Sequence, residues 1–174
     1  MAIRTILHYP DKRLRIPGEK VDPARISDKA IQTLIDDMAE TMYAAPGVGL
    51  AATQIGVALQ LFIVDVAGED EPSDLRVFIN PEIIEKVDAI VWSEGCLSFP
   101  GITEEIERAA HIRARAFDRD GKLFEIEAGE LLAVAIQHEY DHLLGKLMID
   151  HLGPLKKRLL HRKMQKRAEA TSSV

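Results

Sequence analysis

Residues 137–142 read QHEYDH and end a segment whose apolar residues recur with helical spacing. Positions four apart share one face of an α-helix, about 6 Å apart along its axis. His138 and His142 could therefore hold one metal ion, and Glu139 beside them could accept a proton from a metal-bound water. This arrangement is typical of metal-assisted hydrolysis of an amide or an ester. It predicts that the fold is built around a metal-binding helix.

The helix that carries this motif is expected over residues 129–144, with Gly145 just past its end. Leu131 and Ala135 share a stripe with both histidines, so the histidines should face the core. An earlier helix is expected over residues 28–45, with Ser27 as its N-cap. Its apolar face is formed by Ile31, Leu34, Ile35, Met38 and Met42.

Between these helices the chain alternates apolar runs with turn residues. Strands are expected over residues 59–66, 77–79, 83–92, 111–117 and 123–128, and a flexible loop over residues 47–49. Strands in succession with helices before and after predict an α+β fold, in which antiparallel β-sheets pack around the central metal-binding helix. We expect one domain over residues 1–174, with a C-terminal helix over about 154–168 and a frayed polar tail over 170–174.

The composition is that of an ordinary globular protein. The 174 residues suit one domain, and the net charge of -6 argues against nucleic acid as the general partner of the surface. No apolar run is long enough to cross a membrane, and the N-terminus lacks the features of a secretory signal. The single cysteine excludes an internal disulfide and fits a reducing compartment. We expect a monomeric, cytoplasmic protein.

The short motif has a purely structural alternative, namely two core histidines beside a solvated glutamate. Burying two imidazoles is unfavourable unless their nitrogens have partners, and a metal would supply them. A third ligand is then needed. The residue at position 148 is Met148, which excludes a metzincin site, and Glu169 in the expected tail is a poor thermolysin-type ligand. Cys96 is the best remaining candidate, although a free cysteine is more often a small buried apolar group.

Together, three segments closely resemble the motifs of peptide deformylases. They read GVGLAATQI over residues 47–55, EGCLS over 94–98 and QHEYDH over 137–142. The resemblance implies removal of the N-formyl group from the first methionine of new polypeptides, with release of formate. It also implies that Cys96, His138 and His142 hold one divalent metal with a water in the fourth position. Fe²⁺ is the usual native metal of the family, and Zn²⁺, Ni²⁺ or Co²⁺ can replace it. Ligand chemistry alone would suggest zinc first.

The same resemblance implies roles for the residues around the metal. Glu139 would act as general acid and base, and the Gln54 side chain and the Leu97 backbone N–H would stabilise the oxyanion. Residues expected to contact the substrate are Val48, Gly49, Leu97, Leu131, Val134 and His138. Leu131 and Val134 could instead serve only in helix packing, and Gln54 could be an ordinary loop residue. Arg108 and Glu94 could orient groups around Cys96.

Two charged regions of the sequence do not decide which partners the protein binds. Glu104 and Glu105 make the loop after Cys96 acidic, where some bacterial members carry a basic residue. The C-terminal helix is basic, and this charge predicts either ribosome contact or merely a solvated face. Its basic residues are Lys156, Lys157, Arg158, Arg162, Lys163, Lys166 and Arg167. Alternative functions are a general metalloprotease and a ribosome-associated binding protein with a structural metal.

Overall fold

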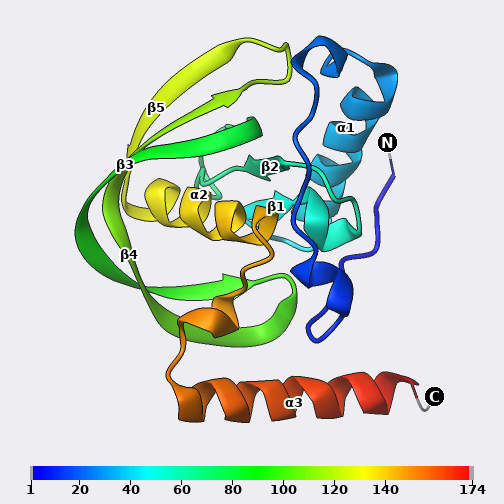
Figure 1. Cartoon of the computed structure of the whole chain (residues 1–174), viewed down its shortest axis with the longest axis vertical. Helices are drawn as coiled ribbons and strands as arrows, with labels where there is room; N and C mark the ends of the chain where they lie inside the picture. Colours follow the sequence, from blue (N-terminus) through cyan, green and yellow to red (C-terminus); the bar gives the residue numbers. More distant parts are fainter. Residues whose placement is uncertain (1, 173–174) are drawn as a thin grey trace.

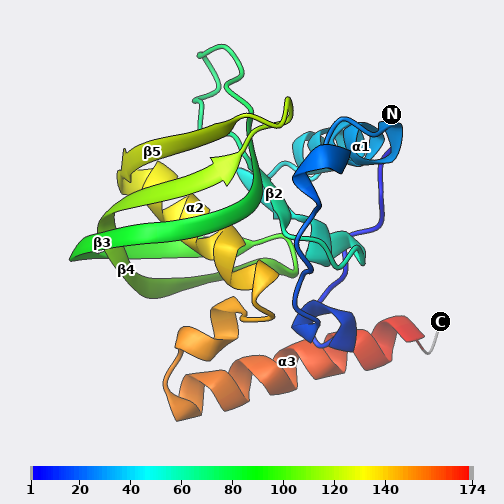
Figure 2. The same cartoon turned by 45° about the horizontal axis from the view of Figure 1, so that its top comes forward.

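In the computed structural model, which describes residues 2–172, one curved sheet wraps around helix α2 (Glu130–Leu143) (Figure 1). Helix α1 (Lys29–Ala44) packs on the first strands of this sheet, and helix α3 (Pro154–Ser172) lies below the rest of the fold (Figures 1 and 2). The expected α+β class is confirmed. Within the described residues, four short 3-10 helices join these elements, namely η1 (Lys12–Arg15), η2 (Pro23–Arg25), η3 (Ala52–Ile55) and η4 (Met148–His151).

The sheet is antiparallel throughout, and its strands follow one another in chain order. They are β1 (Gly49–Ala51), β2 (Leu61–Val64), β3 (Arg76–Cys96), β4 (Phe99–Phe117) and β5 (Leu123–Gly129). The predicted strands 77–79 and 83–92 are parts of the single long strand β3. The pairing of β3 with β4 shifts register near Ile79, Ile83 and Gly95. Such irregularities bend a strand, which helps this hairpin to curve around α2.

Two segments expected to be loops take part in the sheet. Gly49 pairs with Val64, so the predicted flexible loop at residues 47–49 runs into the edge strand β1. The acidic segment after Cys96 belongs to β4, where Glu104 pairs with Glu94. This part of β4 has one buried face, formed by Ile102 and Ile106, and one face in water. Because polar residues alternate with the apolar ones here, a search for apolar runs in the sequence does not detect this strand.

Helix α1 buries the apolar face that its sequence predicts. Leu34, Ile35, Met38 and Met42 lie in a core cluster with residues of β1 and β2. The helix begins one residue later than expected, at Lys29, with Asp28 as its N-cap. Helix α2 packs against the hollow of the sheet and is one residue shorter at each end than the expected 129–144. Gly145 follows its C-cap with φ of 74°, as predicted. A Cβ at Gly145 would lie 2.5 Å from the carbonyl oxygen of Arg15, so glycine also permits this close approach.

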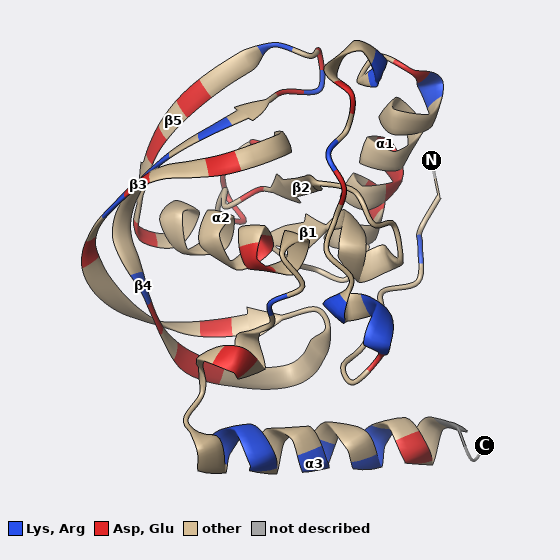
Figure 3. Cartoon of the chain, viewed as in Figure 1, with Lys and Arg blue, Asp and Glu red and all other residues tan. Residues whose placement is uncertain are grey.

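Helix α3 is attached to the domain through its apolar side. Leu160 and Met164 are buried in a cluster with Phe99 and Ile106. The helix continues to Ser172, beyond the end expected near residue 168, whereas residues 173–174 of the predicted tail lie outside the described residues. Its basic residues lie along the exposed length of the helix (Figure 3). No helix within residues 2–172 is long and apolar enough to cross a membrane.

The junction between β5 and α2 contains a strained residue. Glu130 has φ of 52°, a left-handed conformation that disfavours side chains with a Cβ by about 1–2 kcal/mol. We therefore expect Glu130→Gly to be more stable than Glu130→Ala by about 1 kcal/mol, the reverse of the usual order in helices. Both substitutions remove the same charge, so the comparison isolates the backbone. Urea denaturation of the two variants measures the difference, and an alanine variant as stable as the glycine variant would contradict this account.

Candidate active site

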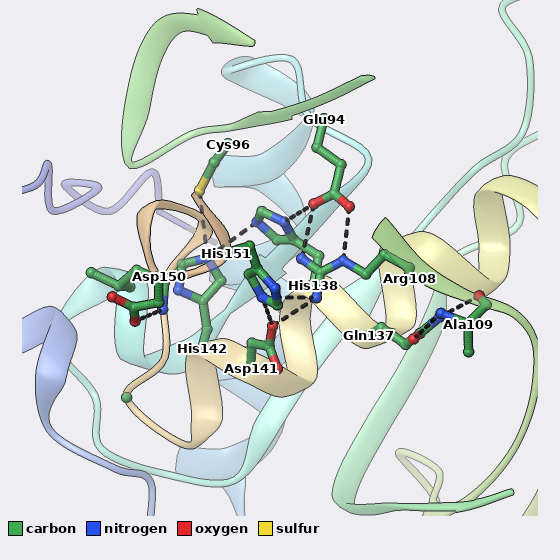
Figure 4. A network of polar contacts seen from close by, with 12 residues as sticks. Glu94, Cys96, Arg108, Ala109, Gln137, His138, Asp141, His142, Asp150 and His151 are labelled. Carbon is green, nitrogen blue, oxygen red and sulfur yellow. Dashed lines mark hydrogen bonds and ion pairs between the residues drawn. The ribbon is translucent and has the colours of Figure 1, made fainter. Parts of the chain in front are cut away.

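The two histidines of α2 and the cysteine at the end of β3 meet at one point. The Nε2 atoms of His138 and His142 are 3.3 Å apart, and the Sγ atom of Cys96 is 3.4 Å from Nε2 of His142 (Figure 4). One ligand atom from each of the three residues lies within 4.8 Å of the others, so the group could hold a metal ion. Cys96 pairs with Phe99 across the β3–β4 turn, which brings the thiol to α2. The structure therefore brings together the three residues predicted as ligands.

The charges around these residues fit a cation. Burial lowers the pKa of His142 well below its ordinary value, which leaves the neutral imidazole that a metal requires. Burial also disfavours charged His138, but Cys96 and Glu139 outweigh it and raise the pKa of His138 well above its ordinary value. The site thus favours a positive charge among these groups. One thiolate and two imidazoles suit Zn²⁺ and other divalent transition metals.

Glu139 lies beside this centre with its carboxylate almost fully buried. Only 4% of the residue is exposed, and its Oε1 atom has no hydrogen-bond partner among the described residues. Burial is the main cause that raises the pKa of Glu139 to about 7. A buried carboxylate without a partner is unfavourable, so its presence beside three metal-ligand atoms points to a chemical role. A carboxyl group with a pKa near neutrality is suited to accept and return a proton.

Gln54 is held in place from both ends of its amide. It lies in η3 with 1% of the residue exposed. Its Oε1 accepts a hydrogen bond of 2.9 Å from the Ala51 N–H, and its Nε2 donates to Ser98 Oγ at 3.0 Å. The same Nε2 lies 3.7 Å from Cys96 Sγ. The amide nitrogen is therefore fixed next to the centre, on a buried residue of a 3-10 helix instead of a loop.

A cavity of about 730 Å³ opens onto this group. Every residue predicted to contact the substrate lines it, namely Val48, Gly49, Leu97, Leu131, Val134 and His138. Leu97 lies in the tight turn between β3 and β4 and closely approaches Gly47, where an added Cβ would be 2.7 Å from Leu97 Cδ1. The cavity wall continues along the β3–β4 hairpin past Trp92 and Thr103.

Glu94 and Arg108, predicted to orient groups around Cys96, instead lie behind His138, where Glu94 contacts the imidazole. The Arg108 guanidinium donates to both oxygens of Glu94, at 2.8 Å and 2.9 Å, and Glu94 Oε1 is 2.9 Å from His138 Nδ1. Three further residues of the site were missed by the sequence analysis, namely Ser98, Asp141 and His151. Ser98 lies inside the motif at residues 94–98 and Asp141 inside the motif at residues 137–142, so their positions in the motifs could have indicated them. No sequence pattern points to His151.

The comparisons with known proteins agree with this geometry. A family model described as polypeptide deformylase matches residues 3–158. The chain belongs to the polypeptide deformylase family. Peptide deformylases are hydrolases that remove N-formyl groups from new polypeptides, so the resemblance seen in the three motifs and the predicted enzyme class are both confirmed.

The relatives match the deformylase chain over almost its whole length. The peptide deformylase of Stenotrophomonas maltophilia (strain R551-3) is 49% identical over 166 residues, which cover 95% of this chain and 96% of that protein. That of Xylella fastidiosa (strain M12) is 49% identical over 172 residues, with 99% and 100% covered.

Solved deformylase structures share the fold. The crystal structure of a peptide deformylase from Legionella pneumophila has a TM-score of 0.89 at 45% identity and covers 98% of both chains. That of the Ehrlichia chaffeensis peptide deformylase in complex with actinonin has a TM-score of 0.89 at 35% identity, with 96% of this chain and 98% of that chain covered.

Proposed function

We propose that Cys96, His138 and His142 hold one divalent metal that supports removal of the N-formyl group from the terminal methionine of new polypeptides. The convergence of their three ligand atoms within 4.8 Å, beside a buried carboxylate, carries the proposal. When bound, such a metal would activate a water by lowering its pKa to near 7. Fe²⁺ is the ion we expect natively from the family, and Zn²⁺, Ni²⁺ or Co²⁺ also suit these ligands.

Glu139 would move the proton that the hydrolysis requires. Its Oε1 is available as an acceptor, and its pKa near 7 allows it to take a proton from the attacking water. The water oxygen bonds to the formyl carbon, the bond from that carbon to nitrogen breaks, and Glu139 returns the proton to the leaving amine. The products are formate and a polypeptide with a free N-terminal methionine.

Two donors would stabilise the oxyanion that forms during the attack. We assign them to the side-chain amide of Gln54 and the backbone N–H of Leu97. The hydrogen bonds from Ala51 and to Ser98 support the first assignment, because they fix the direction of the Gln54 amide before substrate arrives. Donors placed in advance need no reorganisation when the charge develops.

The substrate would bind as an extended strand along the edge of the sheet. Strand β1 is the first in the strand order, so within residues 2–172 only one of its sides is paired, and Val48 before it is 47% exposed. A peptide that adds to such an edge is held by main-chain hydrogen bonds. Val48 and Gly49 would make these contacts, while the methionine side chain would enter the apolar part of the cavity between Leu97, Leu131 and Val134.

The proposal is tested by formate release from formyl-Met-Ala-Ser and from its acetyl analogue, with protein purified without oxygen and its metal quantified. We expect rapid release from the formyl peptide, slow or no release of acetate, and about one metal per chain. A Cys96→Ser variant should lose both metal and activity. Cleavage of internal peptide bonds would indicate a general metalloprotease instead, and bound metal without turnover, in the Co²⁺ and Ni²⁺ forms as well, would indicate a binding protein.

Gly49 should be essential for the position of Glu139. A Cβ at Gly49 would lie 2.5 Å from Glu139 Oε2 and 2.9 Å from its Cδ, closer than carbon and oxygen atoms can pack. Gly49→Ala should therefore displace the carboxylate and lower kcat by about 100-fold, as misplacement of a catalytic group by 1 Å can do. Gly153→Ala is the matched control, since an added Cβ there meets nothing within 4 Å. Equal kcat values for the two variants would show that the added Cβ at Gly49 does not displace the Glu139 carboxylate.

We also propose that the basic face of α3 contacts the ribosome, where the formylated N-terminus emerges. The basic side chains of α3 are exposed in an otherwise acidic chain. Because α3 also buries Leu160 and Met164, charge reversal tests this better than truncation. Changing Arg158, Arg162 and Lys166 to Glu should abolish co-sedimentation with ribosomes, whereas changing the exposed Lys20, Lys86 and Lys122 should not. The cytoplasmic location and the monomeric state stay predictions.

A further inference from the structure

A continuous series of polar contacts leads from His138 outward to the 3-10 helix η4. It passes through Glu94 on β3, Arg108 on β4 and Asp141 on α2, and ends at His151 (Figure 4). Four separate elements of the fold therefore meet behind one of the three metal-ligand residues. The mechanism proposed above uses only His138 from this series.

The inner half of the series fixes the ring of His138. Its Nδ1 donates to Glu94 Oε1 at 2.9 Å, which leaves the Nε2 lone pair directed at the metal position. The Glu94 carboxylate is held in turn by the Nε and Nη2 atoms of Arg108. Both side chains are only 4% exposed, so this two-point ion pair is shielded from water. A change in the direction of Arg108 would consequently be passed to Glu94 and to the imidazole.

The outer half fixes Arg108. Its Nη1 donates to Asp141 Oδ2 at 2.7 Å, and the same oxygen lies 2.8 Å from His151 Nε2. His151 Nε2 is closer to this oxygen than to Arg108 Nη1, at 3.4 Å, which assigns the Nε2 proton to the bond with Asp141. Two donors therefore fix the direction of the Asp141 carboxylate.

Helix α2 thus supplies a metal-ligand residue and the anchor of its supporting arginine from one rigid element. His138 and Asp141 are three positions apart, so both follow any movement of α2 together. His151 is the one group in the series that comes from outside the helix and the sheet. Its side chain is 20% exposed, so removal of its N–H should leave the apolar core unchanged.

We propose that Asp141 and His151 are positioning residues for the metal centre, which hold Arg108 so that Glu94 fixes the ring of His138. This rests on the proposed function, because it presupposes a metal at His138. The residues act through two other side chains and touch neither substrate nor metal. Loss of outer partners of this kind typically lowers metal affinity about 10- to 100-fold.

The test measures Co²⁺ affinity by chelator competition, together with the visible spectrum of the Co²⁺ form, in the full chain. His151→Phe keeps a planar ring but removes the donor, and we expect its affinity for Co²⁺ to fall about 10-fold with an altered spectrum. His151→Gln places an amide N–H near the position of Nε2 and should restore both. His111→Phe, at an exposed histidine of β4, is the matched control and should resemble the parent.

A double-mutant cycle separates positioning from general packing. In a Glu94→Gln background the link to His138 is weakened, so His151→Phe should have little further effect on Co²⁺ affinity. Thermal unfolding of each metal-free variant checks that the fold is kept. If His151→Phe does not fold, the comparison of His151→Gln with Asp141→Asn provides the same test, since only the second removes the anchor of Arg108.

Three outcomes would overturn the inference. Parent-like affinity and spectrum for His151→Phe would show that His151 does not position the centre, while leaving the proposed function intact. An equal loss in the Glu94→Gln background would show that the effect does not pass through Glu94. Failure of the parent chain to bind Co²⁺ would remove the proposed metal site and the inference with it.

Discussion

Replacement of Glu139 by glutamine is expected to lower kcat for formate release by about 10²- to 10⁴-fold, the usual contribution of general acid–base catalysis. Glutamine has almost the same shape and fits the buried position against Gly49, but it can neither accept a proton from the attacking water nor return one to the amine. The three residues proposed to hold the metal are unchanged, so metal content should stay at about one ion per chain. Formate assays and metal analysis of the same preparation measure the two effects.

Glu127→Gln is the matched control for this variant, because Glu127 is exposed on β5 and does not line the cavity. It should keep the activity of the parent. Retention of activity in Glu139→Gln would remove the carboxylate from the mechanism. Loss of metal together with activity would instead give Glu139 a role in holding the ion.

The second large effect is expected for Gln54→Ala. Loss of one oxyanion donor typically lowers kcat by about 10²- to 10³-fold, which corresponds to about 2.7–4 kcal/mol of transition-state stabilisation. Because the donor acts on charge that develops only during the attack, KM for the formyl peptide should change little. Steady-state kinetics separates the two constants, and metal analysis should show that the ion is retained.

The truncation of Gln54 also removes its hydrogen bonds with Ala51 and Ser98, so a loss of stability must be distinguished from a loss of catalysis. Gln32→Ala serves as the control, since Gln32 makes comparable hydrogen bonds to Ile26 and Arg119 away from the cavity. It should lower the free energy of unfolding by about 1–3 kcal/mol without a matching loss of kcat. Normal turnover in Gln54→Ala would exclude Gln54 as the donor.

Local patterns predicted the helices well and the sheet only in part. The apolar stripe of Leu34, Ile35 and Met38 has one helical period and is buried as expected. The first half of β4 was missed because Glu105 and Glu107 on its solvated face interrupt the apolar residues. Its partner strand β3 supplies the backbone hydrogen bonds, and a search for apolar runs within one segment cannot detect such pairing between segments.

The residues of the candidate site were likewise predicted only in part. Cys96, His138 and His142 could be predicted because metal ligation demands certain residue types, and two of them obey helical spacing. Ser98 and His151 act through contacts with residues 44 and 10 positions away, respectively. Serine and histidine occur in many roles, so only the folded arrangement assigns one here. Arg108 was assigned to the right neighbourhood, but its link to Asp141 was not foreseen.

The unpaired side of β1 has a consequence for the breadth of the enzyme's repertoire. Main-chain N–H and C=O groups are the same in nearly every polypeptide. A peptide aligned on this edge would therefore be bound with little dependence on its side chains. Discrimination would then rest on the first residue and its formyl cap, which would lie in the cavity beside Cys96 and His138. One small hydrolase could thereby process the beginnings of thousands of unrelated proteins without a dedicated pocket for any of them.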